Sequence, residues 1–193
     1  LIDLSDAIDL ILDRVPGPAG SEVVSLGQAG GRVLAEVARS DVDVPPFDKA
    51  AMDGFAYRAE DAPQAPVELP VVMEVPAGAT PPRALAPGEA AQVMTGAPVP
   101  DGADTVVQWE WTSGMGQPTV VLERLPRPGA NLSPRGEITA LDQVVLRPGV
   151  VLGPEELGLL ASVGVDPVQV WRRPRVAILS TGDEVVPPAR IPG

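Results

Sequence analysis

The residues best placed for chemistry are carboxylates and hydroxyls that stand beside turn-forming residues in three short blocks. The first block spans residues 45–56 (PPFDKAAMDGFA), the second spans 94–104 (MTGAPVPDGAD) and the third spans 180–184 (STGDE). Prolines stiffen such loops, and Gly54 allows a turn that a β-carbon would block. The side-chain oxygens suit the hydrogen-bond donors of a substrate or a hard cation. Any metal bound by these blocks is therefore expected to be a hard cation such as Mg²⁺.

Two of these residues have both a chemical and a structural interpretation. Asp53 could hold a metal or accept hydrogen bonds from a substrate, but it could equally cap a turn by bonding its own backbone. Thr95 and Gly96 follow an apolar strand, where a hydroxyl and backbone N–H groups suit an oxyanion such as phosphate or molybdate, with a plain β-turn as the alternative. Asp104 and Glu110 are weaker candidates, and Glu110 is typical of a solvent-facing strand residue.

The third block follows the apolar run Val176–Leu179, which is typical of a buried parallel strand in an α/β sheet. Ligands of such sheets bind at the carboxyl ends of the strands. There Thr181 can donate to phosphate, Gly182 allows a close approach of the backbone, and Asp183 or Glu184 can coordinate Mg²⁺. On its own the block could equally be a simple turn.

Composition narrows the class of protein. The 193 residues carry a net charge of −12 and contain neither Cys nor His. Strong negative charge opposes binding to nucleic acid or to an anionic membrane. Without Cys and His, disulfides, thiol catalysis and ordinary structural zinc sites are excluded for this segment. We see no signal peptide and no apolar run of about 18 residues, so we expect a soluble cytoplasmic protein.

The elements that must position the blocks are mostly short strands between glycine and proline turns. Residues 4–15 have helical apolar spacing and predict a packing helix. From about residue 46 to 138 the pattern becomes β, typical of a barrel or sandwich-like module. The candidate strands are Val67–Val75, Ala90–Met94, Thr105–Trp111, Thr119–Leu125 and Gln143–Leu146.

Outside that stretch the pattern mixes helix and strand. We predict a short helix over 25–31, a strand over Val33–Val37 and a strand over Val168–Trp171. Gly153-Pro154-Glu155-Glu156 should open a helix, because proline suits the first turn and acids suit its positive end, and Gly164 should stop it.

Taken in order, the three blocks resemble the molybdopterin molybdenumtransferases, which put molybdenum into molybdopterin and whose eukaryotic relative is the C-terminal domain of gephyrin. The resemblance runs over essentially the whole chain. It implies a reaction in which adenylylated molybdopterin and molybdate give molybdenum cofactor and AMP, with Mg²⁺ as the metal. It further implies a homodimer whose sites combine the β module of one subunit with the α/β domain of the other, and the molybdopterin adenylyltransferase as another partner.

The resemblance also implies a fold of the α+β class that is mainly β. We expect an N-terminal packing helix over 1–20, a discontinuous helix/strand domain over 21–45 and 139–171, and an inserted barrel- or sandwich-like β module over 46–138. Residues 172–193 would begin a three-layer α/β domain that binds the pterin. Because that domain would be incomplete, we expect residues 1–193 alone to be inactive.

The site residues that the resemblance implies are carried over one by one. The catalytic residues would be Asp53, Thr95 and Glu184, of which Asp53 and Glu184 would also hold the metal. The residues that bind the cofactor would be Thr181, Gly182, Asp183 and Arg135, although a surface Arg beside a turn is an equal interpretation of Arg135.

Two departures from the family pattern keep a second function open. Ala50 stands where the family usually has Ser, and Ile138 stands where it has an active-site Asp. These changes favour a non-catalytic scaffold or dimerisation module of the gephyrin type, which is the main alternative. An acidic β-rich binding domain with no enzymatic role is the third.

Overall fold

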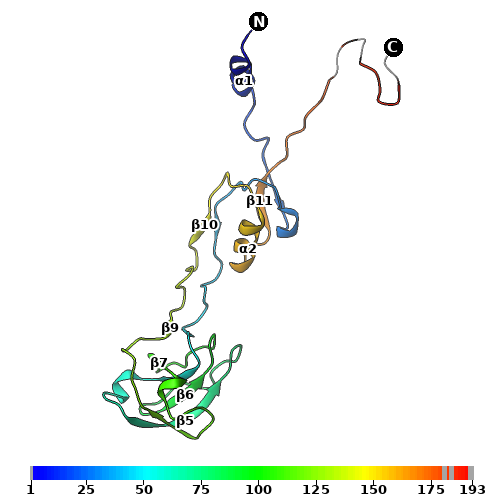
Figure 1. The fold of residues 1–193 in the computed structure, drawn as a ribbon. Helices are drawn as coiled ribbons and strands as arrows, with labels where there is room; N and C mark the ends of the chain where they lie inside the picture. Colours follow the sequence, from blue (N-terminus) through cyan, green and yellow to red (C-terminus); the bar gives the residue numbers. More distant parts are fainter. Residues whose placement is uncertain (1, 180–181, 183–184, 191–193) are drawn as a thin grey trace.

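The computed structural model describes residues 2–179, 182 and 185–190, and in this range the chain is mainly β with two α-helices. Figure 1 shows an elongated molecule with a β module at one end. Two long segments that include β2 and β10 run side by side from it to a smaller region around α2 and β11. Helix α1 and the C-terminal segment project beyond that region.

The β module is built on one curled five-stranded sheet with the strand order β7-β4-β6-β5-β8. Its strands are β4 (Gly54–Tyr57), β5 (Val67–Val75), β6 (Ala90–Val93), β7 (Thr105–Gln108) and β8 (Thr119–Leu122). Strands β5 and β6 are parallel, and the other neighbours are antiparallel. The mainly β prediction is confirmed, and strand β5 has the predicted bounds.

Both faces of this sheet are covered by apolar side chains. Along β4, Phe55 and Tyr57 pack into one buried cluster with Val107 and Leu122, whereas Ala56 packs into another on the opposite face. Alternate residues of a strand point to opposite faces, so a strand covered on both sides is buried along its length. A polar residue in such a strand needs a partner, and Gln92 on β6 accepts a hydrogen bond from the N–H of Gly116 at 2.8 Å. All four residues of β4 and all four of β6 are accordingly buried.

The sequence does not predict strand β4, because Gly54, Phe55 and Ala56 belong to the turn-rich first block. The predicted strand over Thr105–Trp111 was too long. It ends at Gln108, and residues Trp109–Trp111 form a 3₁₀ helix (η3) instead. Glu110 therefore lies in η3 and is not the solvent-facing strand residue that the sequence predicted.

The smaller region joins residues from both ends of the chain. Strand β1 (Ser21–Val24) pairs with β11 (Val168–Trp171), and β2 (Ala38–Arg39) pairs with β10 (Val144–Leu146). Helix α2 (Pro154–Ser162) begins at Pro154 and is followed by Gly164 with a positive φ, as predicted. Residues 26–28 form only a 3₁₀ helix (η1, Leu26–Gln28), and the predicted strand Val33–Val37 is reduced to isolated bridges at Val33 and Leu34.

The buried clusters separate along the chain. Two of them consist of residues between 50 and 122, and the third combines residues from 29–38 with residues from 152–170. This separation supports the expected inserted module, although the boundaries near 45 and 139 stay a prediction. A short pair of strands, β3 (Lys49–Ala50) and β9 (Leu132–Ser133), lies where the chain enters and leaves the module.

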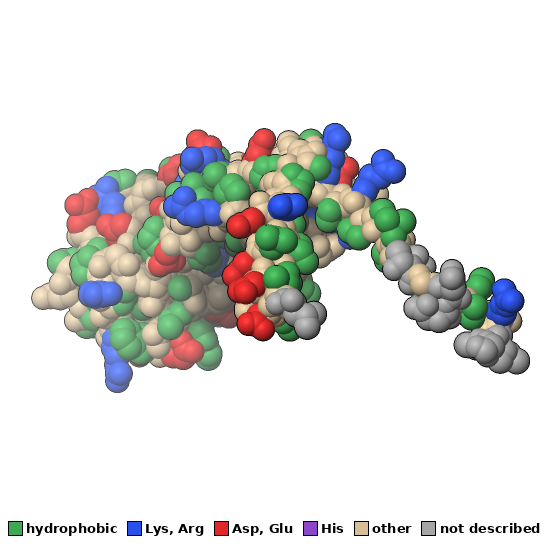
Figure 2. Space-filling model, turned by 90° about the horizontal axis from the view of Figure 1, so that it is seen from above, with side chains coloured by type: hydrophobic (Ala, Val, Ile, Leu, Met, Phe, Trp, Pro, Cys, Tyr) green, Lys and Arg blue, Asp and Glu red, His purple; other side chains and the backbone are tan. Residues whose placement is uncertain are grey.

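Helix α1 (Leu4–Leu12) forms as predicted, but the described residues do not bury its apolar stripe. Leu4 is 78% exposed and Ile11 is 62% exposed. Figure 2 shows the projecting N-terminal segment with acidic side chains along one side and hydrophobic ones along the other. The expected packing of this helix is thus not seen within the described part of the chain. Neither described helix is long and apolar enough to cross a membrane.

The predicted parallel strand Val176–Leu179 is wrong for the described structure. Its residues form no strand, and Ile178 and Leu179 are 91% and 88% exposed. A parallel strand takes its hydrogen bonds from neighbouring strands and its burial from covering helices. The described residues provide neither, so an apolar run alone is not enough to form it.

A close approach of strands depends on Gly54. A β-carbon at this position would lie 1.9 Å from the carbonyl oxygen of Val107 on β7, and its φ is outside the left-handed region. The glycine is therefore needed for space between strands, not for a turn as the sequence suggested.

We predict that Gly54→Ala destabilises the module by about 1–3 kcal/mol, as overpacking of a core does. Hydrogen exchange of the intact protein should show lost protection in β4 and β7.

Gly158 provides the matched control, since it lies in α2 with no atom within 4 Å of the β-carbon position. Gly158→Ala should stabilise its helix by about 0.5–1 kcal/mol. Unchanged protection of β4 and β7 in Gly54→Ala would contradict the role given to this glycine.

Candidate functional site

Asp53 and Thr95 meet because their strands are neighbours. Asp53 directly precedes β4 and Thr95 lies two residues after β6, and these strands are antiparallel with Gly54 opposite Val93. The backbone N–H of Thr95 donates to Oδ1 of Asp53 at 2.6 Å. The hydroxyl Oγ1 of Thr95 donates to the same oxygen at 2.7 Å. Two residues 42 positions apart in the sequence thus form one hydrogen-bonded unit.

These two hydrogen bonds set the charge of Asp53. They lower the pKa of its carboxyl below the ordinary value, first through the backbone N–H of Thr95 and then through its hydroxyl, with partial desolvation acting in the opposite direction. Asp53 is therefore ionised near neutral pH. Both bonds are to Oδ1, and no described residue donates to the other oxygen, Oδ2, which is therefore available to a metal ion or to a donor on a substrate.

The same bonds change the role expected for Thr95. An ionised carboxylate only accepts hydrogen bonds, so both the hydroxyl and the N–H of Thr95 must donate to Asp53. Neither donor is then free for an oxyanion in this structure. In this structure Thr95 orients Asp53, and its contact with an oxyanion stays a prediction.

Asp53 and Thr95 line an open cavity of about 290 Å³. Its other lining residues are Ala51, Met52, Gln108, Trp109 and Glu110. Glu110 was a weaker candidate from the sequence, and it lies in the same cavity as Asp53. Gln108, Trp109 and Met52 were not identified as site residues, since only the pairing of β4 with β7 brings 108–110 next to 51–53.

The loop before Asp53 is held by backbone hydrogen bonds to the second block. The N–H of Ala50 donates to the carbonyl of Ala97 at 2.9 Å, and the N–H of Gly96 donates to the carbonyl of Ala50 at 2.9 Å. Ala50 is fully buried among core residues. The departure from Ser at this position therefore affects core packing in this chain, and it removes no hydroxyl from the cavity of Asp53.

Arg135 lies outside the cavity of Asp53. Its Nε donates to Oδ2 of Asp43 at 2.6 Å, and its backbone N–H donates to Oδ1 of Asp48 at 2.8 Å. The pKa of Asp43 is lowered, chiefly by the N–H of Leu141 and then by the hydrogen bond from Arg135. These contacts tie the loop of residues 135–141 to the segment before the module. They match the interpretation of Arg135 as a surface residue beside a turn.

The position of the missing family Asp lies outside this cavity as well. Ile138 is 67% exposed, and the nearby Asp142 is exposed with a positive φ of 63°. Neither residue lines the cavity of Asp53. The described residues offer no substitute for that Asp beside Asp53 other than Glu110.

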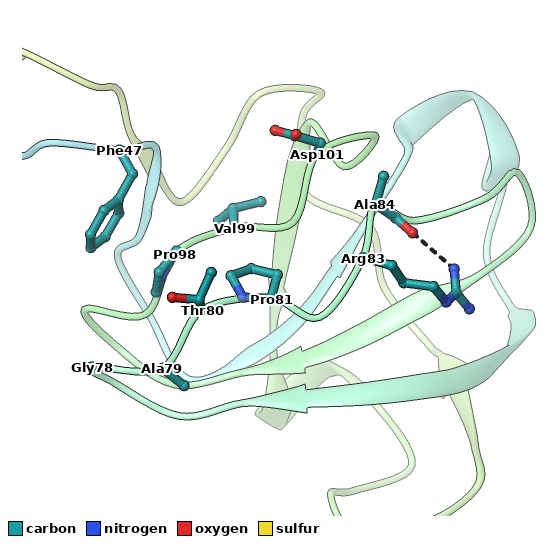
Figure 3. Close-up of a pocket in the computed structure, with 10 residues that line it drawn as sticks. All are labelled: Phe47, Gly78, Ala79, Thr80, Pro81, Arg83, Ala84, Pro98, Val99 and Asp101. Atoms are coloured by element: carbon teal, nitrogen blue, oxygen red, sulfur yellow. Dashed lines mark hydrogen bonds between the residues drawn. The ribbon is translucent and has the colours of Figure 1, made fainter.

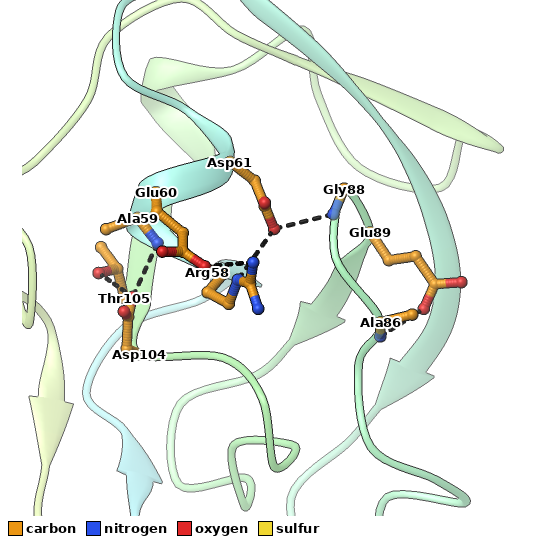
Figure 4. Close-up of polar contacts among 9 residues, drawn as sticks. All are labelled: Arg58, Ala59, Glu60, Asp61, Ala86, Gly88, Glu89, Asp104 and Thr105. Atoms are coloured by element: carbon orange, nitrogen blue, oxygen red, sulfur yellow. Dashed lines mark hydrogen bonds and ion pairs between the residues drawn. The ribbon is translucent and has the colours of Figure 1, made fainter.

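Asp104 has a structural role. It accepts hydrogen bonds from the N–H of Ala59 and the hydroxyl of Thr105, both at 2.8 Å. Figure 4 shows this carboxylate beside the short helix η2 (Ala59–Asp61), with Arg58 paired to Glu60 and Asp61. Burial raises the pKa of the nearby Tyr57 hydroxyl to about 12, and the charge of Asp104 acts in the same direction.

A larger cavity, of about 470 Å³, lies elsewhere on the module. Figure 3 shows Phe47, Pro81, Pro98 and Val99 around it, while the side chain of Arg83 points away and bonds the carbonyl of Ala84. None of the predicted site residues lines it. Its size alone therefore does not make it the catalytic site.

The third block is only partly described. Gly182 is exposed with a φ of 112°, a left-handed conformation that favours glycine. The predictions for Thr181, Asp183 and Glu184 lie outside the described residues.

The described residues can hold part of a metal site. Within the described ranges, no group of three or more Asp, Glu, His or Cys side chains lies close enough to hold a metal ion. Mg²⁺ however keeps several waters and is commonly bound by one or two carboxylates together with substrate phosphates. The ionised Asp53, with Oδ2 available and Glu110 in the same cavity, fits such a partial site.

Residues 2–164 match the family described as the MoeA N-terminal region (domain I and II). The chain is 39% identical over 188 residues to a molybdopterin molybdenumtransferase of Nostoc sp., covering 94% of this chain and 43% of that protein. It is 41% identical over 169 residues to molybdopterin molybdenumtransferase 2 of Mycobacterium tuberculosis, covering 86% and 42%. The chain thus spans less than half the length of these relatives.

The fold is similar to that of solved relatives. Two crystal structures of the molybdopterin biosynthesis MoeA protein from Pyrococcus horikoshii superpose with TM-scores of 0.87 and 0.86, at 36% and 38% identity. Each comparison covers 98% of this chain and about half of the other, 49% and 51%.

The contribution of the Thr95 hydroxyl to the lowered pKa of Asp53 can be isolated with Thr95→Val, which keeps the backbone N–H. We predict that the pKa of Asp53 rises in this variant but stays below its ordinary value of 3.8, because the larger cause, the N–H bond, remains. Carboxyl ¹³C NMR of the intact protein measures this pKa. Thr95→Ser should leave it unchanged, because the hydroxyl is kept.

The same variant has a defined pH dependence. A carboxyl whose folded pKa is lowered stabilises the fold above its unfolded pKa and loses that contribution as the pH falls through the folded value. The difference in unfolding temperature between wild type and Thr95→Val should therefore be complete near neutral pH, begin to shrink as the pH falls below the unfolded pKa of about 4, and vanish only below the lowered folded pKa of Asp53. A difference that persists at lower pH would contradict the hydrogen bond as its source.

Proposed function

The chain belongs to the MoeA family through its N-terminal region, and from this premise we propose that it forms the N-terminal part of a molybdopterin molybdenumtransferase. The intact enzyme would convert adenylylated molybdopterin and molybdate into molybdenum cofactor and AMP. The observation that carries this proposal is the ionised Asp53, oriented by Thr95 in a cavity on the β module. Family membership supports assigning this reaction to that carboxylate.

A site that contains neither His nor Cys can catalyse this reaction. Cleavage of a pyrophosphate bond requires that reactants be positioned and that negative charge be neutralised, and it needs no protein nucleophile. Asp53 cannot give up a proton near neutral pH, so its role is to accept hydrogen bonds or to hold a cation. Thr95 keeps the carboxylate in one orientation, which avoids a reorganisation during the reaction.

We propose Mg²⁺ as the metal because the cavity is acidic. Asp53 and Glu110 would repel phosphate or molybdate in the absence of a cation. When bound, Mg²⁺ would neutralise the charge of the phosphate oxygens. Asp53 would hold it through Oδ2, and the family resemblance adds Glu184. Gln108, whose amide also lines the cavity, can donate a hydrogen bond to a substrate oxygen.

The remaining parts of the site are proposed from the family. Thr181, Gly182 and Asp183 would contact the pterin at the start of an α/β domain. Arg135, whose Nε bonds Asp43, would contribute through its other guanidinium N–H groups. The cavity of Asp53 is open, which is consistent with a site completed by the α/β domain of a second subunit in a homodimer. We therefore propose that residues 1–193 alone are inactive, that the enzyme is cytoplasmic, and that the molybdopterin adenylyltransferase supplies its substrate.

One observation favours the second candidate, a scaffold or dimerisation module. The apolar stripe of α1 is exposed, which is typical of a surface that a partner covers. A contact of this kind is compatible with catalysis as well.

To distinguish the two functions, the intact protein should be supplied with adenylylated molybdopterin, and AMP should be measured with and without molybdate. Release of AMP that requires molybdate supports the enzyme, and no release supports the scaffold.

Asp53→Asn tests the carboxylate within that assay. The substitution keeps the size of the side chain but removes the negative charge, so it should lower the rate of AMP release by about a hundredfold or more, as loss of a positioning contact does. The unfolding temperature should fall by no more than a surface hydrogen bond contributes, because Asp53 is exposed and the amide oxygen of Asn can still accept from both donors of Thr95.

Asp142→Asn is the matched control for this variant. Asp142 is also exposed, Asn tolerates its positive φ, and it lies outside the cavity. Its activity should equal that of the wild type. Full activity in Asp53→Asn would remove Asp53 from the mechanism.

A further inference from the structure

Trp109 is the least expected residue in the cavity of Asp53. Its side chain is 46% exposed, although the protein has few aromatic residues and none of the three described hydrophobic clusters includes it. The other two tryptophans differ, because Trp111 packs against a buried cluster and Trp171 lies half-buried on β11. Core packing is therefore not the reason for a tryptophan at position 109.

The backbone of Trp109 is fixed while its indole remains open to the cavity. Its N–H donates to the carbonyl of Asp53 at 3.1 Å. Its carbonyl accepts from the N–H of Thr112 at 3.1 Å and from the hydroxyl of Thr112 at 2.8 Å. The backbone of Asp53 thus anchors Trp109, which lines the same cavity as the Asp53 carboxylate.

The surroundings of the indole indicate the class of ligand. An exposed tryptophan face binds planar rings by stacking, since every nitrogen heterocycle has a π-face. Glu110, the next residue, lines the same cavity and can accept hydrogen bonds from ring N–H and amino groups. The cavity of about 290 Å³ is at the lower end of small-molecule sites, which suits one ring system of a larger substrate.

We propose that Trp109 stacks on a planar, amino-substituted heteroaromatic ring of the substrate and so positions the reacting group beside Asp53. This inference rests on the proposed function, because adenylylated molybdopterin carries two such rings, the pterin and the adenine. Both present a π-face and an exocyclic amine, which is the chemistry that Trp109 and Glu110 recognise.

The test measures the binding of each ring separately to the intact protein. Isothermal titration calorimetry would use AMP in one arm and 6-hydroxymethylpterin in the other, with Mg²⁺ present in both. The proteins would be the wild type, Trp109→Ala, Trp109→Phe and Trp171→Phe. The last is the matched control, since it changes a tryptophan away from the cavity.

Trp109→Ala should weaken binding of one ring by about five- to a hundredfold, the range for loss of one stacked aromatic. Trp109→Phe should restore most of the affinity because it keeps a ring face, and Trp171→Phe should bind like the wild type. Weaker binding in the AMP arm identifies adenine, and weaker binding in the pterin arm identifies the pterin. Unchanged affinity of Trp109→Ala in both arms, or no binding of either ring to the wild type, overturns the proposal.

Steady-state AMP release separates this proposal from the proposed function. Stacking predicts that Trp109→Ala raises KM for adenylylated molybdopterin more than it lowers kcat, because the contact is made in the ground state as well. An active wild type with an unchanged KM in Trp109→Ala would overturn the stacking contact and leave the function standing. An inactive wild type would instead overturn the function.

Discussion

The pairing of β4 with its two neighbours is the constraint on which the rest of the site depends. Paired with β6, it sets Asp53 against the two donors of Thr95. Paired with β7, it brings Trp109 and Glu110 to the same cavity. Gly54 permits the second approach, since any β-carbon there would meet the carbonyl of Val107. A shift of one residue in either register would turn every side chain to the other face and separate these groups.

The sequence predicted those parts of the fold whose local pattern is strong. Strand β5 is long and alternates, and α2 begins with proline and acids and is followed by a glycine, so both were found. Strand β4 was missed because it is short, buried on both faces and begins with glycine. The prediction of a strand at Val176–Leu179 was wrong for the opposite reason. Its composition favours a buried strand, but pairing and cover are not properties of the segment itself.

The candidate site was predictable only in part. Asp53 and Thr95 were identified from their motifs, and the structure brings them together. The direction of the hydrogen bonds between them was not predictable, and it makes Thr95 a positioning residue. Trp109 had no sequence signal beyond its alternation with Glu110 and Trp111. Its exposure results from the 3₁₀ turn that replaces the expected end of the strand. Ala50 is a core residue, so its departure from the family pattern says little about chemistry.

The central claim is that Asp53, held through Oδ1 by Thr95, uses Oδ2 to hold a metal or a substrate group. A crystal structure of the intact protein with Mn²⁺ in place of Mg²⁺ and with AMP tests it most directly, because Mn²⁺ can be located by its anomalous scattering. The account predicts an Mn²⁺ ion at about 2.0–2.3 Å from Oδ2, or a ligand donor within hydrogen-bond distance of it, with both Thr95 bonds intact. Metal and AMP bound elsewhere, with Oδ2 of Asp53 contacting only water or protein, would contradict it.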